Sequence, residues 1–365
     1  MKACIAALAV CAFGIVNAAP AFTVISLPPT VGSLPPTFIA SLNNQGTVVG
    51  ASLSPTGGTK AYSFASSVAT NLGSLPGGIF SGAVKINDAG KAVGYSQSSL
   101  NPQVAVLFDA GTVISLGTLG GTQSRAASIN QSGIIVGWAD TLSSGPRAFA
   151  FSGGVMTSLG TLGGFSSQAT DINAAGGIVG TSSLANGLNR AFVYVAGSMI
   201  DLGTLGGPSS SALAINNFGT VVGRSTDAVG RPRSFTLQAG AMRDLGDLGG
   251  DETYVSDIND LGWTIGVSRN GTGSFRPFLE TAGFMVDIND LIDPLSGWTI
   301  LEANGINESG TIAGYGCNTM GDCRGLLLSP VPEPNSLLLL AAGALSVFFT
   351  LRKRKVKLVG TNSEA

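Results

Sequence analysis

A nine-residue motif recurs seven times in this chain at a nearly constant spacing, and it limits the possible folds more than any other feature. Each copy has an aliphatic residue, Asn, two further residues, Gly, and a short aliphatic stretch that ends in Gly, as in INNFGTVVG from Ile215. The asparagines are Asn43, Asn87, Asn130, Asn173, Asn216, Asn259 and Asn307, with spacings of 44, 43, 43, 43, 43 and 48 residues. Such a period is typical of propellers and solenoids, whose units pack against their neighbours.

One unit, residues 169–211, shows what each repeat encodes. Strands are predicted over residues 169–173, 177–182, 190–195 and 198–202, with a tight turn from Asn173 to Gly176. Asn favours such turns, and Gly tolerates a positive φ angle. Four short strands in about 43 residues are the pattern of a propeller blade.

A second motif, LGTLGG, lies between the first motifs. It occurs at Leu116, Leu159 and Leu202, with variants at Leu72 and Leu245. Glycine runs can cradle phosphate, but here no lysine or helix start follows them. We interpret them as bends between blades.

The two ends of the repeat region complement each other. The seventh repeat lacks a fourth strand, and residues 22–27 (FTVISL) are comparable with residues 197–202 (GSMIDL). We therefore predict an all-β fold, a seven-bladed β-propeller of four-stranded blades closed by an N-terminal strand, since closure removes an exposed sheet edge. A β-solenoid is the alternative, but it would need distinct caps at both ends.

A third motif places a basic residue before an aromatic-rich strand. Three of these residues have an aspartate eleven positions later: Arg190 and Asp201, Arg233 and Asp244, Arg276 and Asp287. Other repeats pair Arg147 with Ser158, Lys60 with Asn71, and the uncharged Val104 with Ser115. Because each pair is symmetric about its turn, the side chains are expected to face each other across antiparallel strands. We interpret the pattern as a recurring cross-strand ion pair or hydrogen bond, not as a basic binding ring.

These units resemble the HAF repeats of bacterial extracellular proteins, a family named for a His-Ala-Phe tripeptide. Here the tripeptide is Arg147-Ala148-Phe149 and Arg190-Ala191-Phe192, with Arg where the name has His. The resemblance covers nearly all of residues 22–328. It implies an extracellular location and little chemistry, and no role of the histidine carries over because the chain has none.

The N-terminus has the three-part layout of a secretory signal peptide over residues 1–19. Lys2 precedes an apolar run from Ile5 to Val16, and small residues follow at Asn17-Ala18-Ala19. A buried N-terminal helix is the alternative.

Near the C-terminus, Val331-Pro332-Glu333-Pro334 precedes an apolar run over residues 337–351, and Arg352-Lys353-Arg354-Lys355 follows it. A helix of that length rises about 22 Å, slightly short for a hydrocarbon core of about 30 Å. The basic cluster is typical of the cytoplasmic end of a membrane span.

This order of segments resembles the PEP-CTERM sorting signal over residues 331–357. The resemblance implies processing by an exosortase near Pro-Glu-Pro in a Gram-negative bacterium that makes exopolysaccharide. A plain C-terminal anchor is the alternative. The predicted organisation is a signal peptide (1–19), a seven-repeat ectodomain (20–330), the sorting signal (331–357) with a transmembrane helix (337–351), and a cytoplasmic tail (358–365).

Composition excludes several function classes. Without histidine, the chain has no Ser-His-Asp or Cys-His nucleophilic site and no His-ligated zinc. Between residues 20 and 330 there are 13 basic and 19 acidic residues, a difference of −6. An acidic ectodomain does not indicate a nucleic-acid partner. No cofactor is expected.

Two cysteines remain after removal of the signal peptide. Cys317 and Cys323 lie six residues apart and would meet an oxidising compartment after export, so a loop disulfide is predicted. Two ligands are too few for structural zinc. The acidic stretches Asp251-Glu252 and Asp287–Asp293 lack an Asp-x-Asp-x-Asp-Gly loop. We expect a solvated surface there, with a Ca²⁺ site as the alternative.

Three charged residues lie two positions before a repeat asparagine: Lys85, Asp171 and Asp257. First strands should line the central channel, so these side chains are expected to approach its axis. The other repeats have Ser41, Ser128, Ala214 and Gly305 there. Glycosidases need two carboxyl groups at a defined separation, but with a charge in only three repeats we favour chance variation at a lining position.

The sequence therefore predicts a non-enzymatic, surface-associated protein of the cell surface or extracellular polysaccharide matrix, such as a biofilm. It would be sorted by an exosortase-type enzyme and anchored in the membrane before processing. Its expected partners are polysaccharide or a surface protein, bound through its loops. Few aromatic residues suit sugar stacking there (Phe80, Phe165, Tyr254). The alternatives are a polysaccharide-active enzyme that uses Asp171 and Asp257, and a structural spacer without a ligand.

Overall fold

The computed structural model describes residues 20–30, 38–54, 57–98, 102–142 and 145–331. The chain divides into two compact units, residues 1–330 and residues 331–365. Predictions that concern residues 1–19 or 332–365, including the signal peptide and the membrane helix, lie outside the described part of the chain. Within that part, no helix is both long and apolar enough to span a bilayer.

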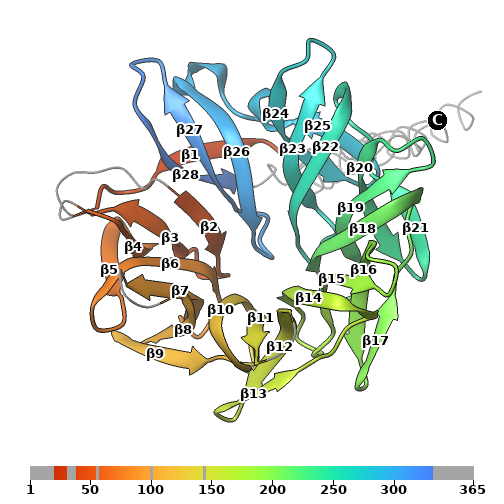
Figure 1. Ribbon diagram of the computed structural model, residues 1–365. Coiled ribbons are helices and arrows are strands. Elements are labelled where there is room, and N and C mark those ends of the chain that lie inside the picture. Colours follow the sequence, from red (N-terminus) through yellow and green to blue (C-terminus); the bar gives the residue numbers. More distant parts are fainter. Residues whose placement is uncertain (1–19, 31–37, 55–56, 99–101, 143–144, 332–365) are drawn as a thin grey trace, which may run out of the picture. The chain divides into compact units, whose positions relative to one another are not determined.

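The described residues of the first unit form seven four-stranded antiparallel sheets around a central channel (Figure 1). Blades 1 to 3 consist of β2 (Phe38–Leu42), β3 (Val48–Leu53), β4 (Thr59–Ala65), β5 (Val68–Gly73); β6 (Gly78–Ile86), β7 (Ala92–Ser98), β8 (Val104–Asp109), β9 (Thr112–Gly117); and β10 (Gly120–Ile129), β11 (Ile135–Thr141), β12 (Arg147–Ser152), β13 (Val155–Ser158).

Blades 4 to 6 consist of β14 (Gly163–Ile172), β15 (Ile178–Leu184), β16 (Asn189–Val195), β17 (Ser198–Asp201); β18 (Gly206–Ile215), β19 (Val221–Asp227), β20 (Pro232–Gln238), β21 (Ala241–Asp244); and β22 (Gly249–Ile258), β23 (Thr264–Asn270), β24 (Phe275–Thr281), β25 (Phe284–Asp287). Two 3₁₀ turns, η2 (Ile288–Leu291) and η3 (Pro294–Ser296), lead to blade 7, which consists of β26 (Trp298–Ile306), β27 (Ile312–Asn318), β28 (Cys323–Pro330) and β1 (Phe22–Ser26).

The N-terminal strand closes the ring, as the sequence predicts. β1 pairs antiparallel with β28, with Phe22 opposite Pro330 and Ser26 opposite Leu326. Phe22 is buried in a cluster with Leu328 and with Ile265 of blade 6. The last blade is thus completed from the opposite end of the repeat region, and the solenoid alternative is wrong.

The core lies between blades. One cluster, for example, joins Val136 and Ala148 of blade 3 to Ile172, Ile178 and Phe192 of blade 4. Each blade therefore buries its apolar residues only against its neighbours, which explains why the aliphatic and aromatic positions recur in every repeat.

Every first strand has a bulge just before its channel-lining residue. In blade 4 the register between β14 and β15 shifts between Ala169 and Asp171. The second-strand glycine beside this bulge, Gly180, lies so close to β14 that a Cβ there would overlap the carbonyl oxygen of Gln168. The same overlap would occur at the glycine that ends each of the other six motifs, so the final Gly is a packing requirement.

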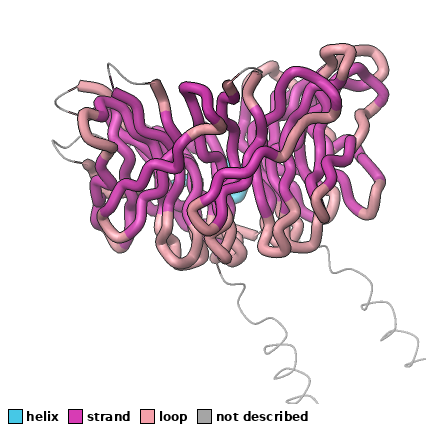
Figure 2. Tube along the Cα trace, turned by 60° about the horizontal axis from the view of Figure 1, so that its bottom comes forward, coloured by secondary structure: helices cyan, strands magenta, loops and turns pink. Residues whose placement is uncertain are grey.

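The strands run between two faces of the ring, which Figure 2 shows edge-on. The turns between first and second strands and between third and fourth strands lie at one face, which we call the turn face. The loops between second and third strands and the connections between blades lie at the other, which we call the loop face. The LGTLGG segments lie in these connections, as predicted.

Candidate functional site in the central channel

The seven repeat asparagines form a closed ring of hydrogen bonds around the channel. Each Oδ1 accepts the main-chain amide four residues later, at 2.8 to 3.1 Å, and so fixes its own turn. Each Nδ2 donates to the main-chain carbonyl of the repeat asparagine in the next blade, at 2.9 to 3.2 Å. Sequence reasoning identified these residues only as turn formers and missed the inter-blade bond.

A second ring involves the residue that follows each asparagine. Main-chain amides of Asn44, Asp88, Ala174, Asn217, Asp260 and Glu308 donate to the side chain at the same position of the next blade. The acceptors include the carboxylates of Asp88, Asp260 and Glu308, so the turn-face end of the channel is acidic. Ala174 has no side-chain acceptor, which interrupts this ring between blades 3 and 4.

The channel cavity has a volume of about 120 Å³. Lys85, Ser128, Asp171 and Asp257 are among its lining residues, so the structure brings together the charged side chains that the sequence placed on the channel. Asp171 and Asp257 are buried.

Both aspartates are bonded to neighbouring blades. Asp171 accepts the Ser128 hydroxyl at 2.7 Å and the Ile215 amide at 2.9 Å, and so links blade 4 to blades 3 and 5. Asp257 accepts the Ile306 amide of blade 7 at 3.2 Å, and the Lys85 ammonium of blade 2 lies 3.6 Å away across the channel. Asp171 thus contacts both adjacent blades, whereas Asp257 contacts one adjacent blade and one across the channel.

The charges in the channel influence one another. Burial raises the pKa of Asp257, and nearby Asp171 adds to this effect while Lys85 opposes it. Burial alone would lower the pKa of Lys85, but Asp257 and Asp171 outweigh it and raise the pKa above its usual value. Lys85 therefore stays protonated beside Asp257.

The expected pairs between the third and fourth strands need a correction. Arg190 and Asp201 form an ion pair at 3.6 Å, but the register places Phe192 opposite Asp201, so Arg190 reaches Asp201 diagonally. The hairpin turns at Ala196 and Gly197. A direct pairing of Arg190 with Asp201 would need a turn centred one residue earlier in the sequence.

The position eleven residues after the basic residue, which holds Asp, Ser or Asn, makes the same local hydrogen bond in six blades. In six blades its side-chain oxygen accepts the main-chain amide two residues later and fixes the bend that follows. The residues are Asn71, Ser115, Ser158, Asp201, Asp244 and Asp287. Local turn formation explains why Ser and Asn replace Asp there.

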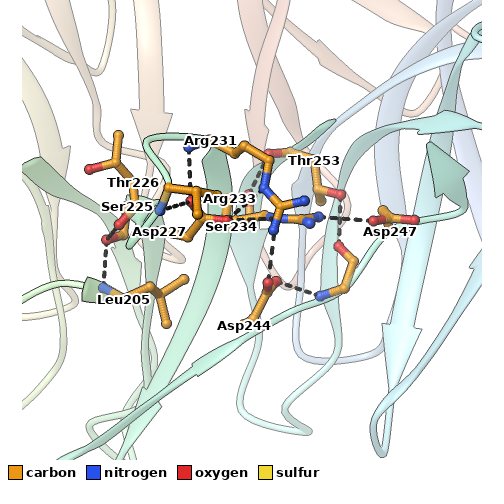
Figure 3. Close-up of polar contacts among 12 residues, drawn as sticks. Leu205, Ser225, Thr226, Asp227, Arg231, Arg233, Ser234, Asp244, Asp247 and Thr253 are labelled. Atoms are coloured by element: carbon orange, nitrogen blue, oxygen red, sulfur yellow. Dashed lines mark hydrogen bonds and ion pairs between the residues drawn. The ribbon is translucent and has the colours of Figure 1, made fainter. Parts of the chain in front are cut away.

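The basic position contacts the next blade. Lys60 donates to the carbonyl of Gly78 at 2.6 Å, Arg147 donates to that of Phe165, and Arg190 donates to that of Pro208, each 18 residues later. In blade 5, Arg233 instead lies among three aspartates, with Asp247 at 3.0 Å, Asp244 at 3.6 Å and Asp227 at 3.9 Å (Figure 3). These contacts confirm a structural role for the basic position.

A buried hydroxyl in the first strand was missed altogether. Ser81, Ser124, Ser167 and Ser210 each accept the amide of an alanine in the preceding blade and donate to a glycine carbonyl of the connection between the blades. Their spacing of 43 residues was the available signal.

The remaining sequence-predicted sites have structural partners. Cys317 and Cys323 face each other in β27 and β28 and are joined by a disulfide. Asp293 accepts the amide of Leu295, and Glu252 lies 3.3 Å from Arg269. Among the described residues, no group of three or more acidic, cysteine or histidine side chains is arranged to hold a metal ion. Of the sorting motif only Val331 is described; Pro332, Glu333, Pro334, Arg352, Lys353, Arg354 and Lys355 lie outside.

Residues 330–355 match the PEP-CTERM protein-sorting motif. The motif defines the class: this is an exported protein that an exosortase-type enzyme recognises and that is anchored in the membrane for processing. No curated protein matches the sequence.

Solved structures resemble the propeller in fold. The β-propeller domain of the Trilobed protease from Pyrococcus furiosus is 10% identical with a TM-score of 0.53, over 82% of this chain and 98% of that one. A puromycin-hydrolyzing peptidase of Mycobacterium tuberculosis is 15% identical with a TM-score of 0.52, over 85% of this chain, and TolB from Acinetobacter baumannii is 14% identical with a TM-score of 0.45, over 78%. This chain spans 57% of the peptidase and 64% of TolB. At these identities the likeness concerns the fold alone.

Proposed function

We propose that this protein is a non-enzymatic, surface-displayed propeller that binds extracellular polysaccharide in the matrix to which exosortase sorting delivers it. The similarity of its units to HAF repeats, which remains a prediction, agrees with that location. The observation that carries the proposal is the bonding of the channel carboxylates. Asp171 and Asp257 hold blades together, so the channel acts as the centre of a rigid scaffold.

A rigid ring leaves recognition to the parts that vary between repeats. The loop face carries the connections of variable length and exposed aromatic residues. Phe80 and Phe165 are 39% and 69% exposed, and they lie in the first strands β6 and β14 near their loop-face ends, not in loops. Exposed rings next to polar groups are suitable surfaces for sugar rings.

A polysaccharide-active enzyme is the second candidate. It is favoured by one observation, the raised pKa of buried Asp257 inside a cavity that also contains Asp171. A carboxyl group with a raised pKa is better suited to act as a general acid near neutral pH.

The channel variants Asp171→Asn and Asp257→Asn separate the two functions. Asn retains a carbonyl oxygen for the Ile215 or Ile306 amide but cannot act as an acid or base. The measurements are new reducing ends released from the producing organism's own polysaccharide and protein retained on it, with circular dichroism to check folding. The proposal predicts no reducing ends from the wild type and unchanged retention of both variants. If the wild type releases reducing ends and the folded variants do not, the protein is a polysaccharide-active enzyme.

A further inference from the structure

An open pocket lies between blades 4 and 5, away from the channel. Its volume is about 220 Å³, and its lining is rich in hydroxyl groups. Thr181 of β15 and Asn189 of β16 form one wall, and Ser209 and Ser211 of β18 with Arg224 of β19 form the other. Neither Asp nor Glu is among the residues that line it.

The pocket lies where two positions that are large at two other interfaces hold small residues. At the equivalent positions of blades 2 and 3, Arg125 lies over the ring of Tyr95, 4.8 Å from its centroid. At blades 5 and 6, Arg224 lies over Tyr254 at 4.7 Å. Between blades 4 and 5 the same positions hold Thr181 and Ser211, 43 residues from their counterparts. The space that an aromatic ring and an arginine fill at those two interfaces is therefore open between blades 4 and 5.

Arg224 supplies the charge of this pocket. The register of β18 and β19 places it opposite Ser211, while its guanidinium stacks on Tyr254 of the next blade. None of the ion pairs among the described residues includes Arg224. A stacked guanidinium keeps its N–H groups in a fixed plane, where they can donate in pairs to a carboxylate.

Three hydroxyl groups beside Arg224 are also free to bind. Those of Thr181, Ser209 and Ser211 make no hydrogen bond to another described residue. In contrast, the Thr226 hydroxyl is occupied by the main chain of Ser209, which it bonds at 3.1 and 3.2 Å. The Asn189 side chain is exposed at the edge of the pocket. The free groups can both donate and accept, as the hydroxyls of a sugar require.

We infer that the pocket between blades 4 and 5 binds a carboxylate-bearing sugar, such as a uronic acid residue of an acidic polysaccharide, with Arg224 on the carboxylate and the free hydroxyls on the ring. This inference rests on the proposed function and names the site and the class of sugar. It also explains how a protein with a charge of −6 between residues 20 and 330 binds an anionic polymer, since the pocket itself contains no acid.

The test measures binding of oligogalacturonate by calorimetry, with neutral malto-oligosaccharide as the reference sugar. Arg224→Gln removes the guanidinium, and Thr181→Tyr fills the pocket with the residue type present at position 95. Each variant is expected to weaken oligogalacturonate binding roughly tenfold or more, the scale of one charge-assisted contact. Arg125→Gln is the matched control, because it removes the same charge from the same stacked geometry at blades 2 and 3. It should change affinity by less than about twofold.

Equal weakening by Arg224→Gln and Arg125→Gln would show general charge attraction and overturn the site. So would unchanged binding by folded Thr181→Tyr, or equal wild-type affinity for the two sugars. Retention on the native polysaccharide separates the two proposals. If wild type and all variants are retained equally, the site is wrong and the proposed function stands; if the wild type is not retained, the proposed function fails.

Discussion

The side-chain amide of Asn307 donates to the main-chain carbonyl of Asn43 at 3.1 Å, across 264 positions of sequence. This bond joins the last repeat to the first and completes the ring of seven equivalent bonds. The pairing of β1 with β28 completes blade 7 on its outer side. Closure is thus made twice, at the channel and at the perimeter.

Removing one donor from the asparagine ring should destabilise the propeller. Asn216→Asp retains an acceptor for the Thr220 amide but loses the donor to Asn259 and places a charge near that carbonyl. We expect the free energy of unfolding to fall by about 1 to 3 kcal/mol, the cost of a buried unsatisfied group. Chemical denaturation measures it. Asn186→Asp is the control, because exposed Asn186 only accepts the amide of Leu188; an equal loss there would contradict the role of the ring.

Completing the second ring should stabilise the propeller. Ala174→Asn would place an acceptor opposite the amide of Gln131, as Asn217 does for the amide of Ala174. One added exposed hydrogen bond is worth about 0.5 to 1 kcal/mol. The check is the unfolding midpoint in denaturant, with Ala175→Asn in the same turn as the control. If both variants behave alike, the interruption at Ala174 has no energetic consequence.

Several hairpin turns hold alanine in a left-handed conformation. Ala196 has a φ of 50°, and Gly197 follows it at 81°. Asn is preferred at the first of two such positions, so Ala196→Asn should raise stability by about 0.5 to 1 kcal/mol. Ala110, Ala239 and Ala282 have φ values of 47° to 51° and should respond in the same way.

The equivalent turn of blade 3 provides the reverse experiment. Gly153 already occupies this position with a φ of 58°. Gly153→Ala should lower the thermal unfolding midpoint by as much as Ala196→Gly raises it. If neither substitution changes the unfolding midpoint, the left-handed conformation of alanine carries no measurable strain in these turns.

Glu308 should make stability depend on pH. Burial raises its pKa, and Asp260, Asp257 and Asp88 add to the effect. A folded-state pKa above the unfolded value means that ionisation opposes folding: the penalty is absent below the unfolded pKa and complete above the folded one. Glu308→Gln retains an acceptor for the Asp260 amide without the charge.

The Gln variant should therefore be more stable than the wild type at pH 7, by less than about 1 kcal/mol at this half-exposed site, and equal to it near pH 3. Thermal unfolding at both pH values measures the difference. Exposed Glu302→Gln is the control, and a stabilisation that persists at pH 3 would exclude charge as its cause.

The sequence predicted the seven blades, their four strands and the closing strand because these follow from a strict repeat and from the missing fourth strand near Arg324. It did not reveal the bond from Asn216 to Asn259, since a hydrogen bond between blades has no signature in local propensity. The diagonal placement of Arg190 was missed because the hairpin register depends on turn geometry. The pocket beside Arg224 arises from two small residues, Thr181 and Ser211, and becomes visible only when adjacent blades are compared.

The most direct test of the account is binding of the isolated ectodomain, residues 20–330, to the producing organism's own extracellular polysaccharide. The bound fraction is measured by co-sedimentation, and polymer length is measured in the same sample by size-exclusion chromatography. The account predicts saturable retention with unchanged polymer length. Shortening of the polymer, or no retention of the folded ectodomain, would contradict it.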